Sequence, residues 1–218
     1  MTTYLTADPH FGHLKMLETD RHPRPFGSVD EMNRVLIANW NKVVASNDKD
    51  VVWVLGDFAL GTTEREMAEI FYQLRGRKKL VIGNHDVDNR GAVKEALLRL
   101  PWDGVATHRA EIKHGGQRII LDHYAGLTWN ADHHGSYLAY GHSHGNLPGL
   151  PGSVDVGMDV QNFRPISVEE FVRQADDSMR NWEKQLDVVI RNLKGRAERY
   201  RRKVEEIRED RPLSARKT

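Results

Sequence analysis

The feature of this 218-residue chain that most constrains its fold is a repeated pattern of apolar strand and polar strand end. Three short runs rich in β-branched and aromatic residues, 3–8, 50–57 and 78–86, each end in aspartate, asparagine or histidine. Segments with helical spacing of apolar residues separate these runs, and capping boxes that begin at Ser28 and Thr63 mark the start of two helices. This alternation of strands and helices is typical of an α/β domain.

The middle of the chain continues the strand pattern. We expect a helix over 91–100, a hairpin that turns at Gly115 and Gly116, and further strands within 136–145 and 153–160. The sequence shows no internal repeat, and 218 residues are long enough for one sizeable core with an appendage or for two small domains.

The C-terminal part is predicted to be a long helical segment that begins at Ser167, where a capping box joins Ser167 to Glu170. Its apolar residues follow a heptad spacing: Val172, Ala175, Met179, Trp182, Leu186, Val189 and Leu193. We therefore divide the chain into a domain over 1–166 and a C-terminal amphipathic helix with a basic tail over 167–218. The heptad seam could pack on the domain or pair with a second copy, and we favour a homodimer to which this helix contributes.

Composition excludes several classes of protein. Apolar residues make up 39% of the chain, and no apolar run approaches the roughly 20 residues of a membrane helix. The N-terminus lacks the pattern of a secretion signal, and the absence of cysteine excludes disulfides and fits the cytoplasm. Charge is unevenly spread, because residues 194–218 hold ten Lys/Arg and five Asp/Glu, whereas residues 1–193 hold 22 and 26.

Every predicted strand end carries side chains that bind metal ions. In chain order they are Asp8 and His10, Asp57, Asn84 with His85 and Asp86, His123, and His142 with His144. Since functional residues gather beyond the carboxyl ends of strands in α/β sheets, we expect these side chains to share one pocket. Each motif alone is common in turns and solvated loops, but their order and placement favour a site. The set suits two divalent ions of the Mn, Fe, Zn or Ni type. It combines carboxylates that can bridge two ions with imidazoles and a neutral amide oxygen.

The series D-x-H, G-D, G-N-H-D, H and G-H-x-H, which runs from Asp8 to His144, resembles the calcineurin-like metallophosphoesterase family over residues 1–166. The strings "DPHFGH" at 8–13 and "HGS" at 134–136 are most similar to the small stand-alone bacterial and phage members. The resemblance implies a four-layer α/β/β/α sandwich with two mixed sheets face to face, followed here by the long C-terminal helical extension.

The resemblance also implies roles for individual residues. The first metal ion would be held by Asp8, His10 and His144, the second by Asn84, His123 and His142, and Asp57 would bridge the two. His85 would face the scissile phosphate, and Asp86 would support His85 or its turn from behind. The implied cofactors are two divalent ions per chain, Mn²⁺ being the first expectation and Fe, Zn or Ni the alternatives. A hydroxide that bridges the ions would attack the phosphorus.

Other polar residues offer weaker signals. His13 and His134 are candidate substrate-binding residues. For His13 an ordinary loop histidine is an equal alternative, and for His134 it is the preferred interpretation. Arg21, His22 and Arg24 lie among prolines, and we expect a solvated loop there in preference to the rim of the pocket.

The favoured function is hydrolysis of small phosphodiesters, such as 2′,3′-cyclic nucleotides, with phosphomonoesters as further substrates. The chain lacks the G-D-x-x-D-R-G string of protein Ser/Thr phosphatases after Gly56, which disfavours that activity. One alternative is a nuclease or RNA-end enzyme guided by the basic tail, but glutamates interleaved with the tail's arginines argue against it. The other is a non-catalytic metal-binding scaffold, and the complete ligand set argues against that.

Overall fold

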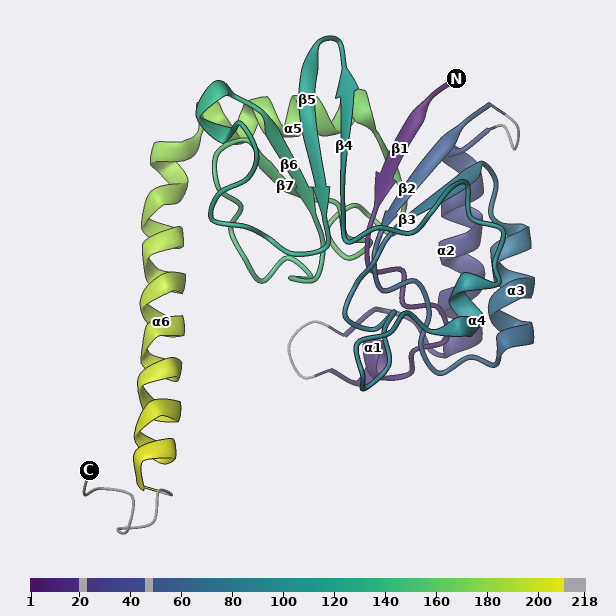
Figure 1. Cartoon of the computed structure of the whole chain (residues 1–218), viewed down its shortest axis with the longest axis horizontal. Helices are drawn as coiled ribbons and strands as arrows, with labels where there is room; N and C mark the ends of the chain where they lie inside the picture. The colour runs from purple at the N-terminus through teal and green to yellow at the C-terminus, as the bar shows by residue number, and fades with distance from the viewer. Residues whose placement is uncertain (20–22, 46–48, 210–218) are drawn as a thin grey trace. The chain divides into compact units, whose positions relative to one another are not determined.

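A computed structural model describes residues 1–19, 23–45 and 49–209 of the chain, which carries two mixed four-stranded sheets (Figure 1). The first sheet has the order β3-β2-β1-β8 and the second the order β4-β5-β6-β7. Their strands are β1 (Thr3–Thr6), β2 (Val51–Leu55), β3 (Arg77–Val81), β4 (Arg109–His114), β5 (Gln117–Asp122), β6 (Tyr137–Tyr140), β7 (Ser153–Asp155) and β8 (Ile166–Ser167). The predicted α/β class with two mixed sheets is confirmed.

Strand directions explain where the strand ends meet. Strands β1, β2 and β3 run parallel, and only β8 is antiparallel to its neighbour in the first sheet. In the second sheet β5, β6 and β7 run parallel, while β4 and β5 form the predicted hairpin. Gly115 and Gly116 both have positive φ, which a two-residue hairpin turn of this kind requires.

The helices are α1 (Lys15–Glu18), α2 (Val29–Val43), α3 (Glu64–Gln73), α4 (Glu95–Leu98), α5 (Val168–Arg180) and α6 (Trp182–Glu209), with a short 3₁₀ helix η1 (Asp132–His134). Both predicted N-caps of the first half are present: the Ser28 hydroxyl accepts from the Glu31 N–H, and the Thr63 box with Glu66 is complete. Helix α4 is shorter than the helix predicted over 91–100. The reason is local, since the Asp88 carboxylate accepts from two backbone N–H groups and closes a turn ahead of α4.

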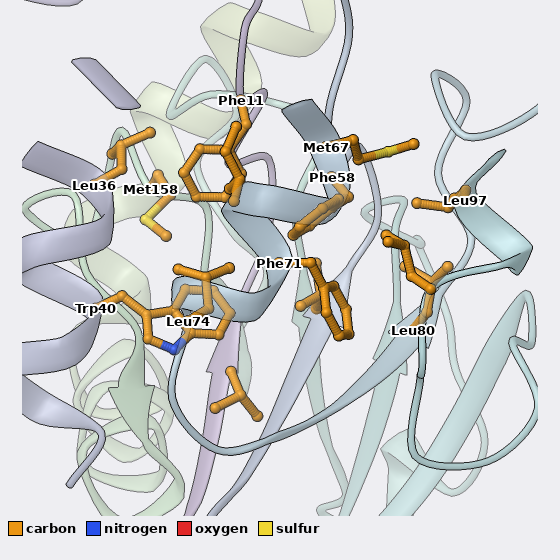
Figure 2. Packing of buried hydrophobic residues seen from close by; sticks show 14 of the residues in the cluster. Phe11, Leu36, Trp40, Phe58, Met67, Phe71, Leu74, Leu80, Leu97 and Met158 are labelled. Atoms are coloured by element: carbon orange, nitrogen blue, oxygen red, sulfur yellow. The ribbon is translucent and has the colours of Figure 1, made fainter. Parts of the chain in front are cut away.

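Helices α2 and α3 cover the outer face of the first sheet and form a helix-side core with it (Figures 1 and 2). Trp40 of α2 is fully buried there, and its indole N–H donates to the Arg75 carbonyl at 2.9 Å. Phe58, which directly follows the polar end of β2, packs edge-on against Phe11 and Phe71. The loops after β1 and β2 are therefore anchored in apolar core immediately beside their polar residues.

A second, inter-sheet core joins the inner faces of the two sheets. Leu5 and Val81 of the first sheet share this core with Ile119 and Leu121 of the second. Helix α5 adds Phe171, which is fully buried in the same core. Helix α5 belongs to the same compact unit as both sheets, Met1–Arg180, which extends past the boundary predicted at residue 166.

The heptad seam predicted from Ser167 onward is divided between two helices. The predicted continuous helix is wrong at one point, because a turn at Asn181 separates α5 from α6. On α5, Ala175 is fully buried in the inter-sheet core. On α6, which lies in the separate unit Asn181–Thr218, Leu186 and Leu193 are exposed by 39% and 50%. Among the described helices, none has both the length and the apolar character needed to cross a bilayer.

The homodimer stays a prediction, and the exposed seam of α6 provides its test. Replacement of both Trp182 and Leu186 by Glu places charges on the apolar seam, and we expect it to convert a dimer to a monomer. Light scattering at micromolar concentration measures the mass directly. Tyr72→Glu, on the exposed face of α3, is the control and should leave the mass unchanged. A wild-type chain that is already monomeric would contradict the prediction.

Candidate metal centre

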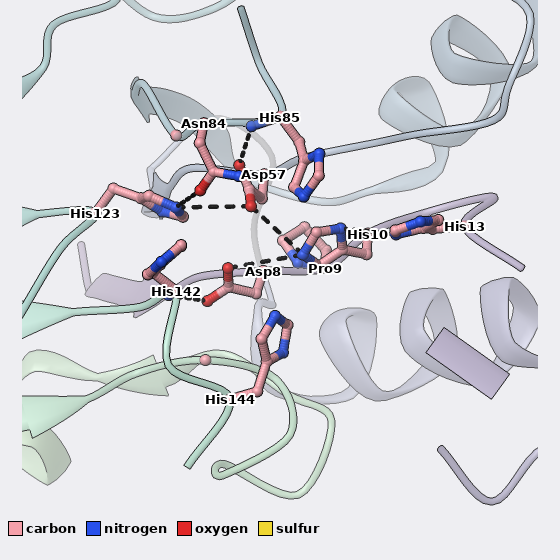
Figure 3. A network of polar contacts seen from close by, with 12 residues as sticks. Asp8, Pro9, His10, His13, Asp57, Asn84, His85, His123, His142 and His144 are labelled. Carbon is pink, nitrogen blue, oxygen red and sulfur yellow. Dashed lines mark hydrogen bonds and ion pairs between the residues drawn. The ribbon is translucent and has the colours of Figure 1, made fainter. Parts of the chain in front are cut away.

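The loops that follow β1, β2, β3, β5 and β6 bring the predicted ligands together at one place in the fold (Figure 3). Two groups form: a first cluster of Asp8, His10 and His144, and a second cluster of Asp57, His123 and His142. Within each cluster, one potential ligand atom from every residue lies within 4.8 Å of the others. The structure thus brings six of the predicted ligands into two clusters.

The first cluster contains buried polar atoms that only a further group could satisfy. Asp8 and His10 are both buried, and Asp8 Oδ1 lies 3.8 Å from His10 Nε2. Neither of these two atoms has a hydrogen-bond partner among the described residues. Since a buried polar atom without a partner costs about 1–3 kcal/mol, the pair fits a cation placed between them. The donor set of carboxylate and imidazole fits a divalent transition metal ion.

Asp57 belongs to the second cluster and also lies close to the first. Its Oδ2 atom is 3.5 Å from His10 Nε2 and 3.6 Å from His123 Nε2. The His123 Nδ1 atom bonds the Leu55 carbonyl at 2.7 Å, which leaves Nε2 directed toward Asp57 and toward Asn84 Oδ1 at 2.9 Å. Asn84 therefore sits beside the second cluster, and the position of Asp57 suits a carboxylate shared by two ions.

Burial sets the protonation of these residues. Burial lowers the pKa of His10 to about 2, and the neighbouring His144 and Arg24 act in the same direction. Burial likewise lowers the pKa of His142. Both imidazoles are neutral at physiological pH, which is the form that binds metal ions. Burial also raises the pKa of Asp8 well above its ordinary value, and a nearby cation would oppose this shift by stabilising the charged carboxylate.

Backbone strain is concentrated at the same residues. Five non-glycine residues of the two clusters have positive φ: Asp8 (53°), His10 (49°), Asp57 (56°), His142 (64°) and His144 (46°). This conformation is uncommon for side chains other than glycine and is found most often at functional sites. No local signal in the sequence indicates it.

The "GNHD" segment is held by its last residue. The Asp86 carboxylate accepts from the backbone N–H groups of Asp57, Phe58 and Gly83 at 2.8, 3.1 and 2.8 Å. It therefore supports the turns after both β2 and β3, which extends the predicted support of a single turn. A side chain at position 83 would place its Cβ 2.7 Å from the Asp57 nitrogen, so this position requires glycine because of close approach.

The histidine loop after β6 is held by residues that the sequence analysis missed. Asp155 accepts from the Ser143 hydroxyl at 2.7 Å and from the Gly145 N–H at 3.1 Å. Asp159 bonds His144 Nδ1 at 2.7 Å. Although burial opposes it, the bonds from His144 and Arg24 hold the pKa of Asp159 well below its usual range. The only available signal was two aspartates in the otherwise apolar run 153–160.

Arg24 corrects the prediction of a solvated loop. Arg24 is only 3% exposed, and its guanidinium pairs with Asp159 instead of facing water. Arg21 and His22, which the same prediction included, lie outside the described residues.

A cavity of about 280 Å³ opens beside the first cluster. Its walls include His13 and His85, together with Lys15 and Asn146. The His85 ring lies 5.3 Å from the His10 ring and 5.8 Å from the His13 ring, and it belongs to neither cluster.

His134 is placed differently from His13. It lies in η1 with an exposed side chain, and its ring contacts that of His133 at 4.2 Å. No contact described in the structure links it to either cluster, so its predicted substrate role has no support from the geometry.

Two mixed sheets with paired His/Asp clusters beyond their strand ends define an α/β protein whose site is consistent with two metal ions. The chain belongs to the calcineurin-like phosphoesterase family, whose sequence model matches residues 1–189.

Known relatives agree with this assignment. An uncharacterized protein of Methanocaldococcus jannaschii is 31% identical over 178 residues, which cover 78% of this chain and 89% of the relative. The gene 66 protein of Mycobacterium phage D29 is 30% identical over 204 residues, which cover 81% and 98%. A crystal structure of an Aquifex aeolicus protein of unknown function matches with a TM-score of 0.63 at 26% identity, covering 79% of this chain and 98% of that one.

The close approach at Gly83 yields a prediction for stability. Gly83→Ala forces the backbone of Asp57 to move, and we expect it to lower the free energy of unfolding by about 1–3 kcal/mol. Urea denaturation of the metal-free protein measures this. Gly27→Ala is the matched control, because its Cβ would meet only one atom within 4 Å, the Glu31 Oε2 atom at 3.2 Å, and no backbone. Equal effects of the two substitutions would count against the packing argument.

Proposed function

We propose that this protein is a phosphoesterase that uses two divalent metal ions to hydrolyse small phosphodiesters, with 2′,3′-cyclic nucleotides as favoured substrates. The observation that carries the proposal is the pair of clusters joined through Asp57, next to a cavity lined by two further histidines. Family membership supports hydrolysis of a phosphoric ester.

In this proposal the first cluster holds one ion and Asn84, His123 and His142 hold the other, with Asp57 shared between them. Mn²⁺ is the first candidate and Fe, Zn and Ni are alternatives. When bound, the two ions would neutralise the phosphate oxygens and make a water molecule more acidic. Substrate binding and proton transfer would be carried out by residues of the chain itself.

His85 is positioned to act on the phosphate group. Its backbone N–H donates to Asp57 Oδ1 at 2.7 Å, and its carbonyl accepts from Lys94 Nζ at 2.6 Å. The backbone is thereby fixed on both sides, while the imidazole lines the cavity. From there it would donate a hydrogen bond to the phosphate or a proton to the leaving oxygen.

The cavity supports a small substrate. Its volume of about 280 Å³ lies just below the range of typical ligand pockets, which is roughly 300–1,000 Å³. His13 and Lys15 at its wall would contact the part of the substrate beyond the scissile phosphate. Nucleic acid remains the second choice, because Glu198 and Glu205 interrupt the exposed basic residues of α6.

Metal dependence tests the proposal. Metal-free protein should not hydrolyse bis(para-nitrophenyl) phosphate, and Mn²⁺ should restore activity better than Ca²⁺ because the ligand set includes imidazoles. A panel of 2′,3′- and 3′,5′-cyclic nucleotides, nucleoside monophosphates and short RNA then ranks the substrates. Full turnover after rigorous chelation would reject the two-metal proposal, and activity confined to RNA would favour the nuclease.

His85 and Asp57 should give opposite results when substituted. His85→Ala should keep both ions and lower turnover on the order of 10²–10⁴-fold, because it removes a proton donor or a charge-stabilising contact. Asp57→Ala should lose metal, because it removes the shared carboxylate. Metal content measured beside kinetics separates these roles. The assignment of His85 is wrong if its removal releases a metal ion or leaves the rate unchanged.

A further inference from the structure

Arg24 places one buried guanidinium against four oxygen atoms. Its Nη2 and Nη1 atoms donate to the carbonyls of Asp8 and Pro9, both at 2.7 Å. Its Nε and Nη2 atoms donate to the two carboxylate oxygens of Asp159 at 2.8 and 2.9 Å. The side chain is completely buried, so water does not compete for these bonds. An arrangement of this kind uses the planar fork of arginine, which lysine cannot reproduce.

The two carbonyls belong to the strained turn that carries the first ligands. Asp8 and His10 both have left-handed backbone conformations, and Pro9 lies between them. Buried carbonyl groups need hydrogen-bond donors, and among the described residues no backbone N–H bonds the carbonyl of Asp8 or Pro9. Arg24 supplies the donors, so it stabilises the conformation that directs Asp8 and His10 into the first cluster.

Asp159 extends the same contact to the other loop. Its Oδ2 atom, which pairs with Arg24, also bonds His144 Nδ1 at 2.7 Å. That bond fixes the orientation of the imidazole and leaves Nε2 for a metal ion. Asp159 is 135 residues from Arg24 in the sequence, so the contact links two distant segments.

We propose that the Arg24–Asp159 pair positions all three residues of the first cluster, and that its loss weakens the ion bound there while sparing the ion at the second cluster. The proposal rests on the proposed function, because it assumes that both clusters bind metal. Its basis is that Arg24 and Asp159 bond the first cluster directly, whereas the hydrogen bonds between the clusters run from the His142 N–H to Asp8 Oδ2 and from the His10 N–H to the Asp57 carbonyl. The second cluster is further held by the bonds of His123 to the Leu55 carbonyl and Asn84. Neither Arg24 nor Asp159 takes part in those bonds of His123.

The experiment adds Mn²⁺ to the metal-free wild-type protein and to three metal-free variants, Arg24→Lys, Arg24→Met and Asp159→Asn. Calorimetry and electron paramagnetic resonance then measure a separate Mn²⁺ affinity for each of the two clusters. His144→Ala and His123→Ala serve as references that identify which affinity belongs to which cluster. In all three test variants we expect the first-cluster affinity to fall by about 10–100-fold, with the second unchanged. Arg24→Lys should not rescue it, because one amine cannot replace the fork.

Arg164→Met is the matched control. Arg164 also forms a two-pronged ion pair, with Glu170 at 3.0 and 2.7 Å, but it contacts neither cluster. It should keep both affinities. Circular dichroism and thermal unfolding of each variant establish that the fold is retained.

The outcomes separate the two proposals. A wild-type chain that binds no Mn²⁺, Zn²⁺ or Fe²⁺ would reject the proposed function itself. A wild-type chain that binds two ions, with an Arg24→Lys variant that binds both equally well, would overturn the positioning role alone. If the Arg24 variants fail to fold, Asp159→Asn decides, because it keeps the shape of the side chain while removing its charge and one acceptor. An unchanged first-cluster affinity in that variant overturns the proposal.

Discussion

The carboxylate of Asp86 is the constraint that joins the loops after β2 and β3, and the part of the site built on those loops depends on it. It accepts three backbone N–H groups from the loops that follow two adjacent parallel strands, β2 and β3. Hydrogen bonds to a charged group contribute about 1.5–3 kcal/mol each, so separating these loops would cost the free energy of those bonds. With the loops joined, Asp57 Oδ1 is placed to accept the His85 N–H. Asp57, Asn84 and His85 therefore take their positions from one buried group.

The two clusters combine strain with support from apolar packing. A left-handed conformation costs a non-glycine residue roughly 1–2 kcal/mol, and five ligand candidates adopt it. Phe11 and Phe58 follow His10 and Asp57 directly and are fully buried in the helix-side core (Figure 2). Such anchors offset the strain, because a turn that relaxed would withdraw an aromatic ring from the core.

The features that could be predicted from the sequence are those that depend on a local pattern of residues. Strand ends, N-caps at Ser28 and Thr63, and metal-binding side chains are all visible within a few residues, and the structure contains them. The role of Arg24 was not predictable, because its partner Asp159 is distant in the chain and burial of an arginine runs against its usual exposure. The division of the C-terminal seam between two helices could not be predicted either. The heptad spacing is the same on α5, which is packed, and on the part of α6 that is exposed.

The charge of the candidate ligand set fits an anionic substrate. Of its seven residues only Asp8 and Asp57 are carboxylates, while the other five are one amide and four imidazoles. The nearby charge of Asp159 is matched by Arg24, so it adds little negative potential to the cavity. Two divalent ions would therefore leave the site with an excess of positive charge, which would favour a phosphoric ester as substrate. An aspartate in place of Asn84 would reduce that excess, which gives a physical reason for a neutral oxygen ligand at this position.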